Sequence, residues 1–583
     1  MNALLALLAA ALTIVYPGPG AQLPAVSRSF VFGASPPGSH VVVNGTAAHS
    51  ASDGGWIAYV PLVPGDFTLN VSAEGDRMWY LQRRIHVAAP LRTDPPAPAR
   101  FDGALSPQPY ANLVVRVGDV VRLQVKGSTG ASASATVGDE GPVQLTETEL
   151  NGARGVYEGQ LRVRPSTRSQ PLPVTYTLRS ANGAAISARA RGRVTVDASA
   201  QPAVGSVALT RTADGQRPYG VVMRSPGNDW FLFPPAGTPF AIEGKDGNFF
   251  RVEAGGGVSG YIYKDNLRIE PPDTPSPSAA LNGIETSDFP TESVVEVHLS
   301  SRVPFTLAES SAATALKLAL FSTDAGTGAL TISGAAEGIS SITRMAAPAG
   351  ALGLRIALRQ HSIWGYHVSW AGNDLEISIK KPPHMDAAPR PALRGLLVVV
   401  DPGHSPDAGA VGPLGTQERV VNLEIARRLA YHLGLFGART LLTRTDESGP
   451  GLYDRTLTAT AANADVLISV HNNAWPDGTD PATQLGYSVY YYHAESLDLA
   501  RAIHAAYARE TQLPDAGLFR EDFALVRPTE QPSVLTESAF ITWPDEEQLL
   551  LSPPFIDRLG ATLADGLERW AEARRALETP RQP

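Results

Sequence analysis

Two imidazoles and one carboxylate each stand just past a run of apolar residues that reads as a buried strand. The runs LLVVVDPGH, VLISVH and SVLTE end in His404, His471 and Glu537. Stretches with helical spacing separate these runs, which predicts an α/β layer with a parallel-rich sheet. Ligands gather at the carboxyl ends of the strands in such sheets, so we expect the three side chains to meet at one edge. Their residue types predict a metal-hydrolase site.

A hydrolytic zinc site takes three ligands from His and carboxylate side chains and leaves one position for water. Glu418, in the GTQER segment that opens a predicted helix, follows His404 closely enough to fold back beside it. Zinc would lower the pKa of its water to about 7 and polarise a carbonyl. A further carboxylate must then accept a proton and pass it to the leaving amine, and Glu537 has the right type and place for that role.

Each of these residues, taken alone, also has an ordinary structural interpretation. A single His after a strand is often a hydrogen-bonded structural residue. Glu418 alone would be an acid favoured by the helix dipole, and Glu537 alone would be a capped or salt-bridged carboxylate. Only the combination of the residues favours a catalytic site.

Composition bounds the rest of the chain. A length of 583 residues predicts roughly four domains. The 54 Gly, the 48 Pro and a charged fraction of only 18% favour β-rich modules joined by linkers. A net charge of -9 without a basic stripe gives no support for nucleic-acid binding. The absence of cysteine excludes disulfides, thiolate metal ligands, a cysteine nucleophile and a lipidated N-terminal Cys.

The first residues, 1–20, resemble a signal peptide. The apolar run from Ala3 to Val15 is too short to span a bilayer but has the length of a signal-peptide core. The alternative is a buried first strand. No other segment is long and apolar enough to cross a membrane, so we expect an exported protein of the periplasm or cell envelope without a transmembrane segment after signal removal.

Four all-β modules are predicted between this segment and the last domain, because short alternating strands are separated by Gly and Pro turns. Proline-rich linkers separate some of them. The predicted modules are a β-sandwich at 21–88, an all-β module at 101–197, a β-barrel at 203–270 and a further β module at 288–381.

Two of these modules resemble known families. Residues 203–270, with Gly turns and a terminal G-Y-I-Y…L pattern, resemble a bacterial SH3-like barrel, in which Trp230, Phe250 and Tyr261 would fill the barrel or line a shallow groove. A plain core role for these aromatics is the alternative. Residues 288–381, with a W-G-Y strand and a closing L-x-I-x-I strand, resemble AMIN domains. Those domains accompany some cell-wall amidases and are associated with binding the envelope.

The C-terminal region, 395–578, resembles zinc-dependent N-acetylmuramoyl-L-alanine amidases of the amidase-3 type. The matching pieces are VVVDPGHSPDAGAVGPLGTQERVVNLEIA, LLTRTDE, RTLTATAANADVLISVHNNA and ALVRPTEQPSVLTESAFITWPDEEQLL, in the family's order. The resemblance implies that His404, Glu418 and His471 are zinc ligands and that Glu537 is the catalytic glutamate. Arg527 matches a position near the family's cleft, where it would meet an anionic group of the peptide.

Other residues near these motifs are candidates for supporting roles. Asp401 is expected either to orient the metal loop or to shape the D-P-G turn. Asn472 and Asn473 would donate to substrate or simply close a loop. Arg455 is expected to form a structural ion pair.

The chain departs from the family pattern in two places. Ser405-Pro406 replaces the usual pair of glycines after the motif His, so the loop beside the metal must follow another path. Trp543 stands where asparagine is common. The segment after His471 is short, with no room for the inhibitory helix that some relatives insert there.

Together these features predict an exported peptidoglycan hydrolase that cuts the amide between N-acetylmuramic acid and L-alanine of the stem peptide. Its cofactor would be Zn²⁺ and its partner peptidoglycan, with a possible envelope or regulatory protein bound through the β modules. The alternatives are a non-catalytic wall-binding protein with a relict amidase domain, and a zinc peptidase acting on wall peptides.

Overall fold

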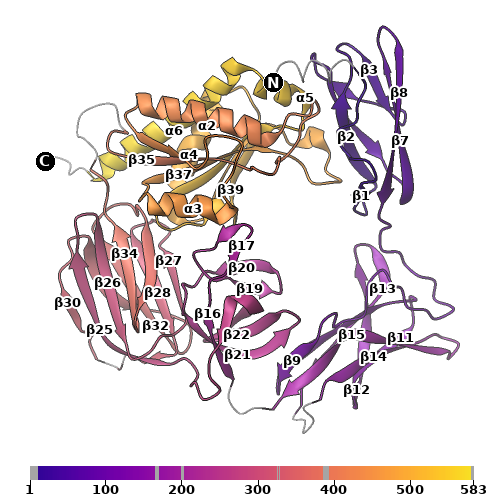
Figure 1. Ribbon diagram of the computed structural model, residues 1–583. Coiled ribbons are helices and arrows are strands. Elements are labelled where there is room, and N and C mark those ends of the chain that lie inside the picture. The colour runs from indigo at the N-terminus through magenta and orange to yellow at the C-terminus, as the bar shows by residue number, and fades with distance from the viewer. Residues whose placement is uncertain are drawn as a thin grey trace.

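The computed structural model describes residues 11–164, 170–198, 202–324, 326, 328–384 and 393–578. Four β modules precede one α/β domain at the C-terminal end of the chain. The first module lies beside that domain, and the next three curve around below it (Figure 1). The predicted fold class, all-β modules followed by an α/β domain, is therefore confirmed at this level.

The first module is a sandwich of a five-stranded sheet, in the order β1-β8-β7-β3-β4, and a three-stranded sheet, β2-β6-β5. Its strands are β1 (Gln22–Leu23), β2 (Arg28–Ala34), β3 (His40–Val43), β4 (Thr46–Ala47), β5 (His49–Ser50), β6 (Gly55–Pro61), β7 (Gly65–Glu74) and β8 (Met78–Val87). Leu12 and Ile14 are buried in its core, and the backbone N–H of Val15 donates to the carbonyl of Phe32 at 2.9 Å.

The signal-peptide-like segment, 1–20, thus shares residues with this module. Residues 1–10 lie outside the described part of the chain. Leu12 and Ile14 belong to the core of this module, but the segment before β1 pairs with Phe32 only through an isolated bridge at Tyr16. Export remains a proposal.

The second and third modules share one sheet of fourteen strands, because β9 pairs in parallel with β15 of the second module and antiparallel with β21 of the third. The second module contains β9 (Leu113–Arg116), β10 (Val120–Lys126), β11 (Ser132–Val137), β12 (Glu140–Leu150), β13 (Ala153–Arg162), β14 (Leu172–Arg179) and β15 (Ala185–Asp197). The third contains β16 (Ala203–Val207), β17 (Arg211–Thr212), β18 (Gly215–Gln216), β19 (Val222–Ser225), β20 (Asn228–Leu232), β21 (Pro239–Asp246), β22 (Phe249–Gly255), β23 (Val258–Tyr263), η1 (Lys264–Asn266) and β24 (Leu267–Ile269).

The fourth module is a sandwich of a six-stranded and a four-stranded sheet. Its strands are β25 (Ala279–Asp288), β26 (Glu292–Leu299), β27 (Phe305–Glu309), β28 (Ala315–Phe321), β29 (Thr323–Asp324), β30 (Ile332–Gly334), β31 (Ile339–Met345), β32 (Ala351–Leu358), β33 (Tyr366–Ala371) and β34 (Asp374–Lys380). The module starts with β25, ahead of the predicted boundary at 288. Strand β25 directly follows a proline-rich segment, so the sequence pattern did not reveal it. It nevertheless pairs with β26 along most of its length.

The C-terminal domain is built on a six-stranded sheet in the order β36-β35-β37-β40-β38-β39, in which only the β38–β40 pair is antiparallel. Its strands are β35 (Leu397–Pro402), β36 (Arg439–Leu442), β37 (Val466–Asn473), β38 (Tyr487–Tyr491), β39 (Asp515–Arg520) and β40 (Ser533–Phe540). Its helices are α2 (Glu418–Leu435), α3 (Leu452–Ala461), η2 (Pro481–Thr483), η3 (Ala494–Ser496), α4 (Leu497–Glu510), η4 (Ala524–Val526), α5 (Pro544–Leu550) and α6 (Pro553–Glu578).

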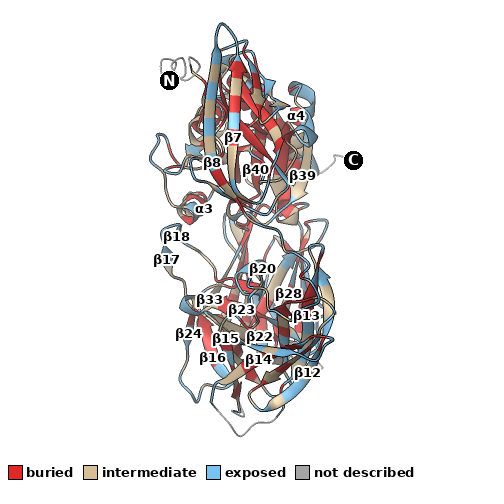
Figure 2. Cartoon of the chain, turned by 90° about the vertical axis from the view of Figure 1, so that its right-hand side faces the viewer, coloured by how far each residue is buried: buried red, intermediate tan, exposed pale blue. Residues whose placement is uncertain are grey.

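Helices α2, α4 and α6 pack together on one face of this sheet, and α3 covers the other. Val421, Ile425, Leu429 and Leu433 recur every four residues on α2, so they form one apolar stripe that is buried in the main core. Each such side chain contributes roughly 1.5–3 kcal/mol when fully buried. Figure 2 shows that β40, in the middle of the sheet, is largely buried. None of the described helices has the length and apolar character needed to cross a membrane.

Among the residues that the structure describes, the first, third and fourth modules contact the C-terminal domain. Phe30 of the first module packs edge-on against Trp475 with ring centroids 6.0 Å apart. In the third module the carbonyl of Asp214 accepts a hydrogen bond from the backbone N–H of Tyr453 at 2.8 Å. In the fourth module the backbone N–H of Tyr366 donates to the carbonyl of Thr529 at 2.6 Å. The segments of the C-terminal domain that carry Trp475, Tyr453 and Thr529 thus each contact a different β module.

Candidate metal centre

The predicted ligands come from three elements that end at one edge of the sheet. His404 lies two residues beyond β35, Glu418 is the first residue of α2, and His471 lies near the end of β37. Two glycines permit the close approach. A Cβ atom at Gly403 would stand 2.2 Å from a ring carbon of His471, and one at Gly409 would stand 2.5 Å from Oε2 of Glu418. The chain therefore needs glycine at both positions to bring the ligands together.

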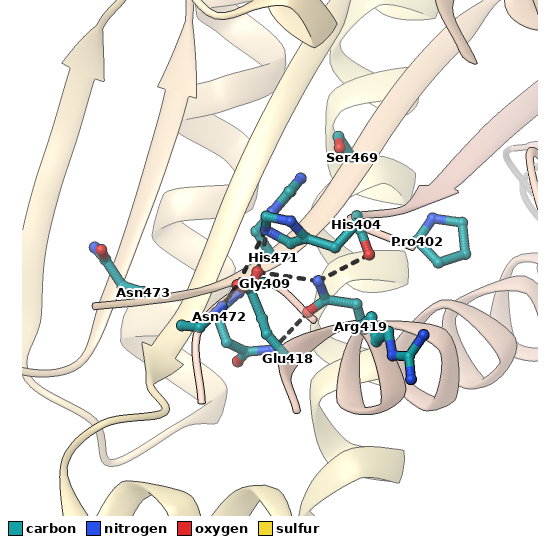
Figure 3. Close-up of polar contacts among 12 residues, drawn as sticks. Pro402, His404, Gly409, Glu418, Arg419, Ser469, His471, Asn472 and Asn473 are labelled. Carbon is teal, nitrogen blue, oxygen red and sulfur yellow. Dashed lines mark hydrogen bonds and ion pairs between the residues drawn. The ribbon is translucent and has the colours of Figure 1, made fainter. Parts of the chain in front are cut away.

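Glu418 lies between the two imidazoles (Figure 3). Its Oε2 is 3.0 Å from Nε2 of His404, and its Oε1 is 3.1 Å from Nδ1 of His471. The two rings lie edge to face with centroids 4.9 Å apart. Glu418 is almost completely buried, whereas His404 and His471 keep side-chain exposures of 30% and 15%. The structure thus brings all three predicted ligands together, with the histidines facing solvent.

The Glu418 carboxylate is fixed by neighbours from three segments. The backbone N–H of Ala410 donates to Oε2 at 2.8 Å, while the backbone N–H of Asn472 and the side-chain amide of Asn422 each donate to Oε1 at 3.1 Å. Burial alone would raise the pKa of Glu418, but the hydrogen bonds and charges of His404 and His471 outweigh it and hold that pKa well below its usual range. Glu418 is therefore a pre-oriented anion.

Asp407 orients His404. Its Oδ1 lies 2.7 Å from Nδ1 of the ring, so Nε2 is the nitrogen that faces Glu418. A carboxylate behind an imidazole is the usual way in which a protein fixes the tautomer of a metal ligand. Burial lowers the pKa of His404, but the Glu418 and Asp407 carboxylates raise it above its ordinary value overall.

Two buried arginines hold the loop that carries His404. Arg455 forms the expected ion pair with Asp401 at 2.8 Å and donates to the carbonyl of His404 at 2.5 Å. Arg444 donates to the carbonyls of Pro402 and Gly403 at 2.9 and 3.0 Å. Burial opposes ionisation of Asp401, but Arg455 and hydroxyl donors keep its pKa below the usual range. Asp401 therefore acts on the loop through Arg455.

This support matters because the loop has an unusual backbone. His404 and Ser405 have φ angles of 63° and 81°, in the left-handed region that L-residues seldom adopt. Two consecutive non-glycine residues there require strong anchoring. The hydroxyl of Ser405 donates to the carbonyl of Glu447, which ties the Ser405-Pro406 turn to the neighbouring loop. The altered path expected at this turn is thus stabilised by its own contacts.

Glu537 lies beside the cluster on the adjacent strand. In the parallel pairing of β37 and β40, Glu537 stands in register with His471, so the two side chains share one face of the sheet. Its Oε2 is buried and has no hydrogen-bond partner among the described residues. Burial, followed by the negative charge of Glu418, raises the pKa of Glu537 well above its usual range. Glu537 is thus a proton-binding carboxylate next to the predicted ligands.

The donor set fits a zinc ion. Two imidazoles and one carboxylate offer ligand atoms that all lie within 4.8 Å of one another, and this combination is typical of hydrolytic zinc sites. Glu418 is held as an anion, His404 has the carboxylate behind it that a ligand needs, and both histidines are reachable from solvent. His404, Glu418 and His471 would hold the metal.

Arg527 occupies a different environment from the one expected. The side chain is only 4% exposed, and it pairs with Asp522 at 2.6 Å and donates to the hydroxyl of Tyr219 at 2.8 Å. Trp230 and Phe233 of the third module also face its guanidinium, with ring centroids 4.8 and 5.0 Å away. Arg527 is thus enclosed at the contact between the third module and the C-terminal domain, where protein groups occupy its donors. Trp230, expected in the barrel or a groove, also lies at this contact.

The two asparagines after His471 have separate positions. Asn472 is buried and supports the metal cluster, because it donates to Glu418 from its backbone and to Asn422 from its side chain at 2.8 Å. Asn473 points away from the cluster (Figure 3) and accepts from the backbone N–H of Ala474.

The first module covers the loop that follows these asparagines. Trp475 stacks on Phe540 with centroids 4.6 Å apart, and His49 of the first module stacks on Trp543 at the same distance. The hydroxyl of Tyr16 donates to Asp477 at 2.5 Å. Trp543, where the family commonly has asparagine, is therefore part of the contact with the first module.

Sequence reasoning missed Asp407, Asn422 and Arg444. Asn422 stands one helical turn after Glu418, and this spacing was a usable signal because residues four apart on a helix are neighbours. Asp407 follows the motif His by three residues and was also available. Arg444 was not recognisable, because its contacts join segments that are far apart in the sequence.

The C-terminal domain is similar to known proteins. Residues 398–569 match the family model described as N-acetylmuramoyl-L-alanine amidase. The N-acetylmuramoyl-L-alanine amidase LytC of Bacillus subtilis is 32% identical over 173 residues, which cover 30% of this chain and 35% of LytC. The probable cell wall amidase LytH of Staphylococcus aureus is 29% identical over 184 residues, which cover 31% of this chain and 60% of LytH.

Solved structures are similar over the same share of the chain. The N-acetylmuramoyl-L-alanine amidase AmiC2 of Nostoc punctiforme is 28% identical to this chain, with a TM-score of 0.29. The match includes 30% of this chain and 97% of the AmiC2 chain. The chain spans about a third to three fifths of the length of the curated relatives named above. The similarity to the amidase family model lies within the C-terminal domain, at residues 398–569.

Proposed function

We propose that this chain is an exported, zinc-dependent peptidoglycan hydrolase that cuts the amide between N-acetylmuramic acid and L-alanine of the stem peptide. The observation that carries the proposal is the convergence of His404, Glu418 and His471, with Glu537 in register beside His471, inside a domain that carries the amidase pattern. Relatives described as probable cell wall amidases support a location in the cell envelope.

The residues divide the work. A zinc ion held there would polarise the scissile carbonyl and activate the attacking water. Glu537 has a raised pKa and no competing partner at Oε2, so it is suited to accept a proton from the attacking water. The same carboxyl group would then return that proton to the departing amine of L-alanine. Glu418, with its pKa held low, stays a ligand and leaves proton transfer to Glu537.

Two other functions make different predictions. A wall-binding protein with a relict domain could have lost any of the four residues, yet all four are present with their supporting contacts. A zinc peptidase would use the same chemistry on a bond between two amino acids. The complete cluster favours an enzyme, and the amidase pattern favours the amide next to the sugar.

Product analysis tests the proposal. The zinc-loaded full chain is incubated with purified peptidoglycan, and soluble products are identified by mass spectrometry with and without a chelator. We expect release of whole stem peptides with a free L-alanine amine, while the glycan strands stay uncut. The chelator should abolish this release of peptides. Release of partial peptides would favour the peptidase, and absence of any soluble product would contradict both enzymatic functions.

A further inference from the structure

A cavity of about 1480 Å³ opens where the second and third modules share their sheet. Strand β9 lies at this seam, because it pairs with β15 on one side and with β21 on the other (Figure 1). Residues from both modules line the cavity, including the segment from Gln108 to Val115 and the turn from Lys245 to Phe249. We call this cavity the seam groove. None of the residues that line it belongs to the predicted metal site.

The seam groove is basic although the chain as a whole is acidic. Five cationic side chains and only one anionic side chain line it, whereas the chain has a net charge of -9. The six charged lining residues are Arg122, Arg191, Arg224, Lys245, Asp246 and Arg251. Such a local reversal of charge attracts an anionic ligand.

Most of these cationic side chains can still bind an anionic ligand. Arg251 is neutralised by an ion pair with Asp119, and Arg224 lies 3.5 Å from Asp229 with both side chains more than half exposed. Arg122 and Arg191 have no ion-pair partner within the ranges that the structure describes, and neither is buried. A guanidinium group without an ion-pair partner can form strong, often bidentate hydrogen bonds to a carboxylate.

The other lining residues suit a carbohydrate. Tyr110 is 46% exposed, and Phe249 and Tyr261 also contribute rings to the wall of the seam groove. Flat apolar rings pack well against the faces of sugar rings. Asn112 and Gln160 line the same wall, and their side-chain amides can donate to and accept from hydroxyl groups. Gln160 pairs directly with Arg122 across β10 and β13, so an amide and a guanidinium stand side by side.

We propose that the seam groove binds a glycan strand whose substituents end in carboxylates. This inference rests on the proposed function, because peptidoglycan with acidic stem peptides supplies that chemistry. The rings take the sugar faces, and Arg122, Arg191 and Lys245 take the carboxylates. A second attachment in another module keeps the catalytic domain close to its substrate and raises the effective substrate concentration.

A binding titration of the full chain tests the seam groove. Glu537→Gln is used as the background so that the strands stay uncut, and the probes are soluble glycan strands with intact stem peptides, the same strands stripped of peptides, and single-stranded DNA. The groove variant carries Arg122→Glu and Arg191→Glu. The matched control carries Arg77→Glu and Arg84→Glu, two exposed arginines of the first module that change the net charge equally.

We expect the groove variant to weaken binding of the peptide-bearing strands at least tenfold, and the control to leave it unchanged. Stripped strands and DNA should bind at least tenfold more weakly than peptide-bearing strands. Equal affinity of the groove variant and its parent would overturn the proposal, as would equal affinity for stripped strands. Binding of DNA as tight as that of peptide-bearing strands would overturn it in favour of a nucleic-acid surface.

These results are separable from the proposed function, because the titration needs no turnover. Release of stem peptides by the parent chain, combined with unchanged binding by the groove variant, would reject the seam groove and keep the amidase. Loss of binding in the groove variant, combined with no release of peptides by the parent, would reject the amidase and keep the seam groove.

Discussion

Two groups of His and Glu side chains come close enough to share an ion within the described part of the chain, and they differ in composition, in burial and in the contacts that hold them. One is His404, Glu418 and His471 at the sheet edge of the C-terminal domain. The other is Glu285, Glu296 and His298 on β25 and β26 of the fourth module, which we call the surface cluster.

Burial and support separate the two groups. Glu418 is 4% exposed and receives three hydrogen bonds that fix both of its oxygens. Glu285 is 53% exposed and lies 3.7 Å from His298, which makes a second ion pair with Asp374 at 3.1 Å. Exposed pairs of this kind contribute little, about 0–1 kcal/mol. Residue types in proximity are therefore not enough, because a metal site also needs neighbours that hold its ligands.

The largest expected contrast comes from the same substitution in each group. Glu418→Gln removes one ligand and the negative charge, so we expect loss of stoichiometric zinc and a fall of stem-peptide release by more than about 1000-fold. Glu296→Gln should leave zinc content and release unchanged. Metal analysis after dialysis, together with the product assay, measures both. A parent chain that retains two zinc ions would contradict the comparison.

A buried ion pair of the fourth module offers the next contrast with the surface cluster. Glu309 and His493 lie 2.9 Å apart with side-chain exposures of 8% and 13%, and join the fourth module to the C-terminal domain. Burial raises the pKa of Glu309, but His493 and the Tyr366 hydroxyl lower it to about 2 from an ordinary 4.5. Since the folded pKa lies below the unfolded one, this stabilisation is complete above pH 4.5 and disappears as the pH falls toward 2.

The shift corresponds to about 3 kcal/mol. We therefore expect the parent chain to lose stability between pH 4.5 and 2 more steeply than Glu309→Gln, as followed by denaturant unfolding and tryptophan fluorescence. Glu285→Gln, in the surface cluster, should change stability by less than about 1 kcal/mol. Identical pH dependence of the parent and Glu309→Gln would show that this pair does not stabilise the contact.

The smallest effect is expected from residues that touch no metal themselves. Asn422→Ala removes a donor from Glu418 and should weaken zinc binding by about 10–100-fold, because outer partners orient the ligands. Asp374→Asn, which removes the corresponding partner of His298, should not change zinc affinity. Competition with a chromophoric chelator measures both affinities. An unchanged affinity in Asn422→Ala would mean that Glu418 is positioned without its amide partner.

Much of the C-terminal domain was predictable from local pattern. Apolar runs identified β35, β37 and β40, and the helical spacing between these runs indicated the helices of an α/β layer. Helix α3 was not predicted, because its Thr-rich sequence has a weak helical preference. Its stability comes from tertiary packing, since Ala459 of α3 shares a buried cluster with Leu525. Register was not predictable, and yet the alignment of His471 with Glu537 decides the site.

Contacts between modules could not be read from the sequence. Arg527 meets Tyr219 across 308 positions of chain, and nothing local indicates that the third module encloses it. The shared sheet of the second and third modules likewise depends on backbone pairing of β9 with β21, which carries no side-chain signature. Long-range packing decides such features, so a residue that matches a cleft position in a family can lie under a neighbouring module.

The central claim is that His404, Glu418 and His471 hold a metal while Glu537 moves protons. Zinc content and stem-peptide release measured on one preparation of Glu537→Gln test it most directly. We expect one zinc per chain, as in the parent, and release reduced by about 100- to 10,000-fold, the usual contribution of a general acid–base. Loss of zinc in Glu537→Gln would make Glu537 a ligand, and full activity would remove it from catalysis; either result would contradict the assignment.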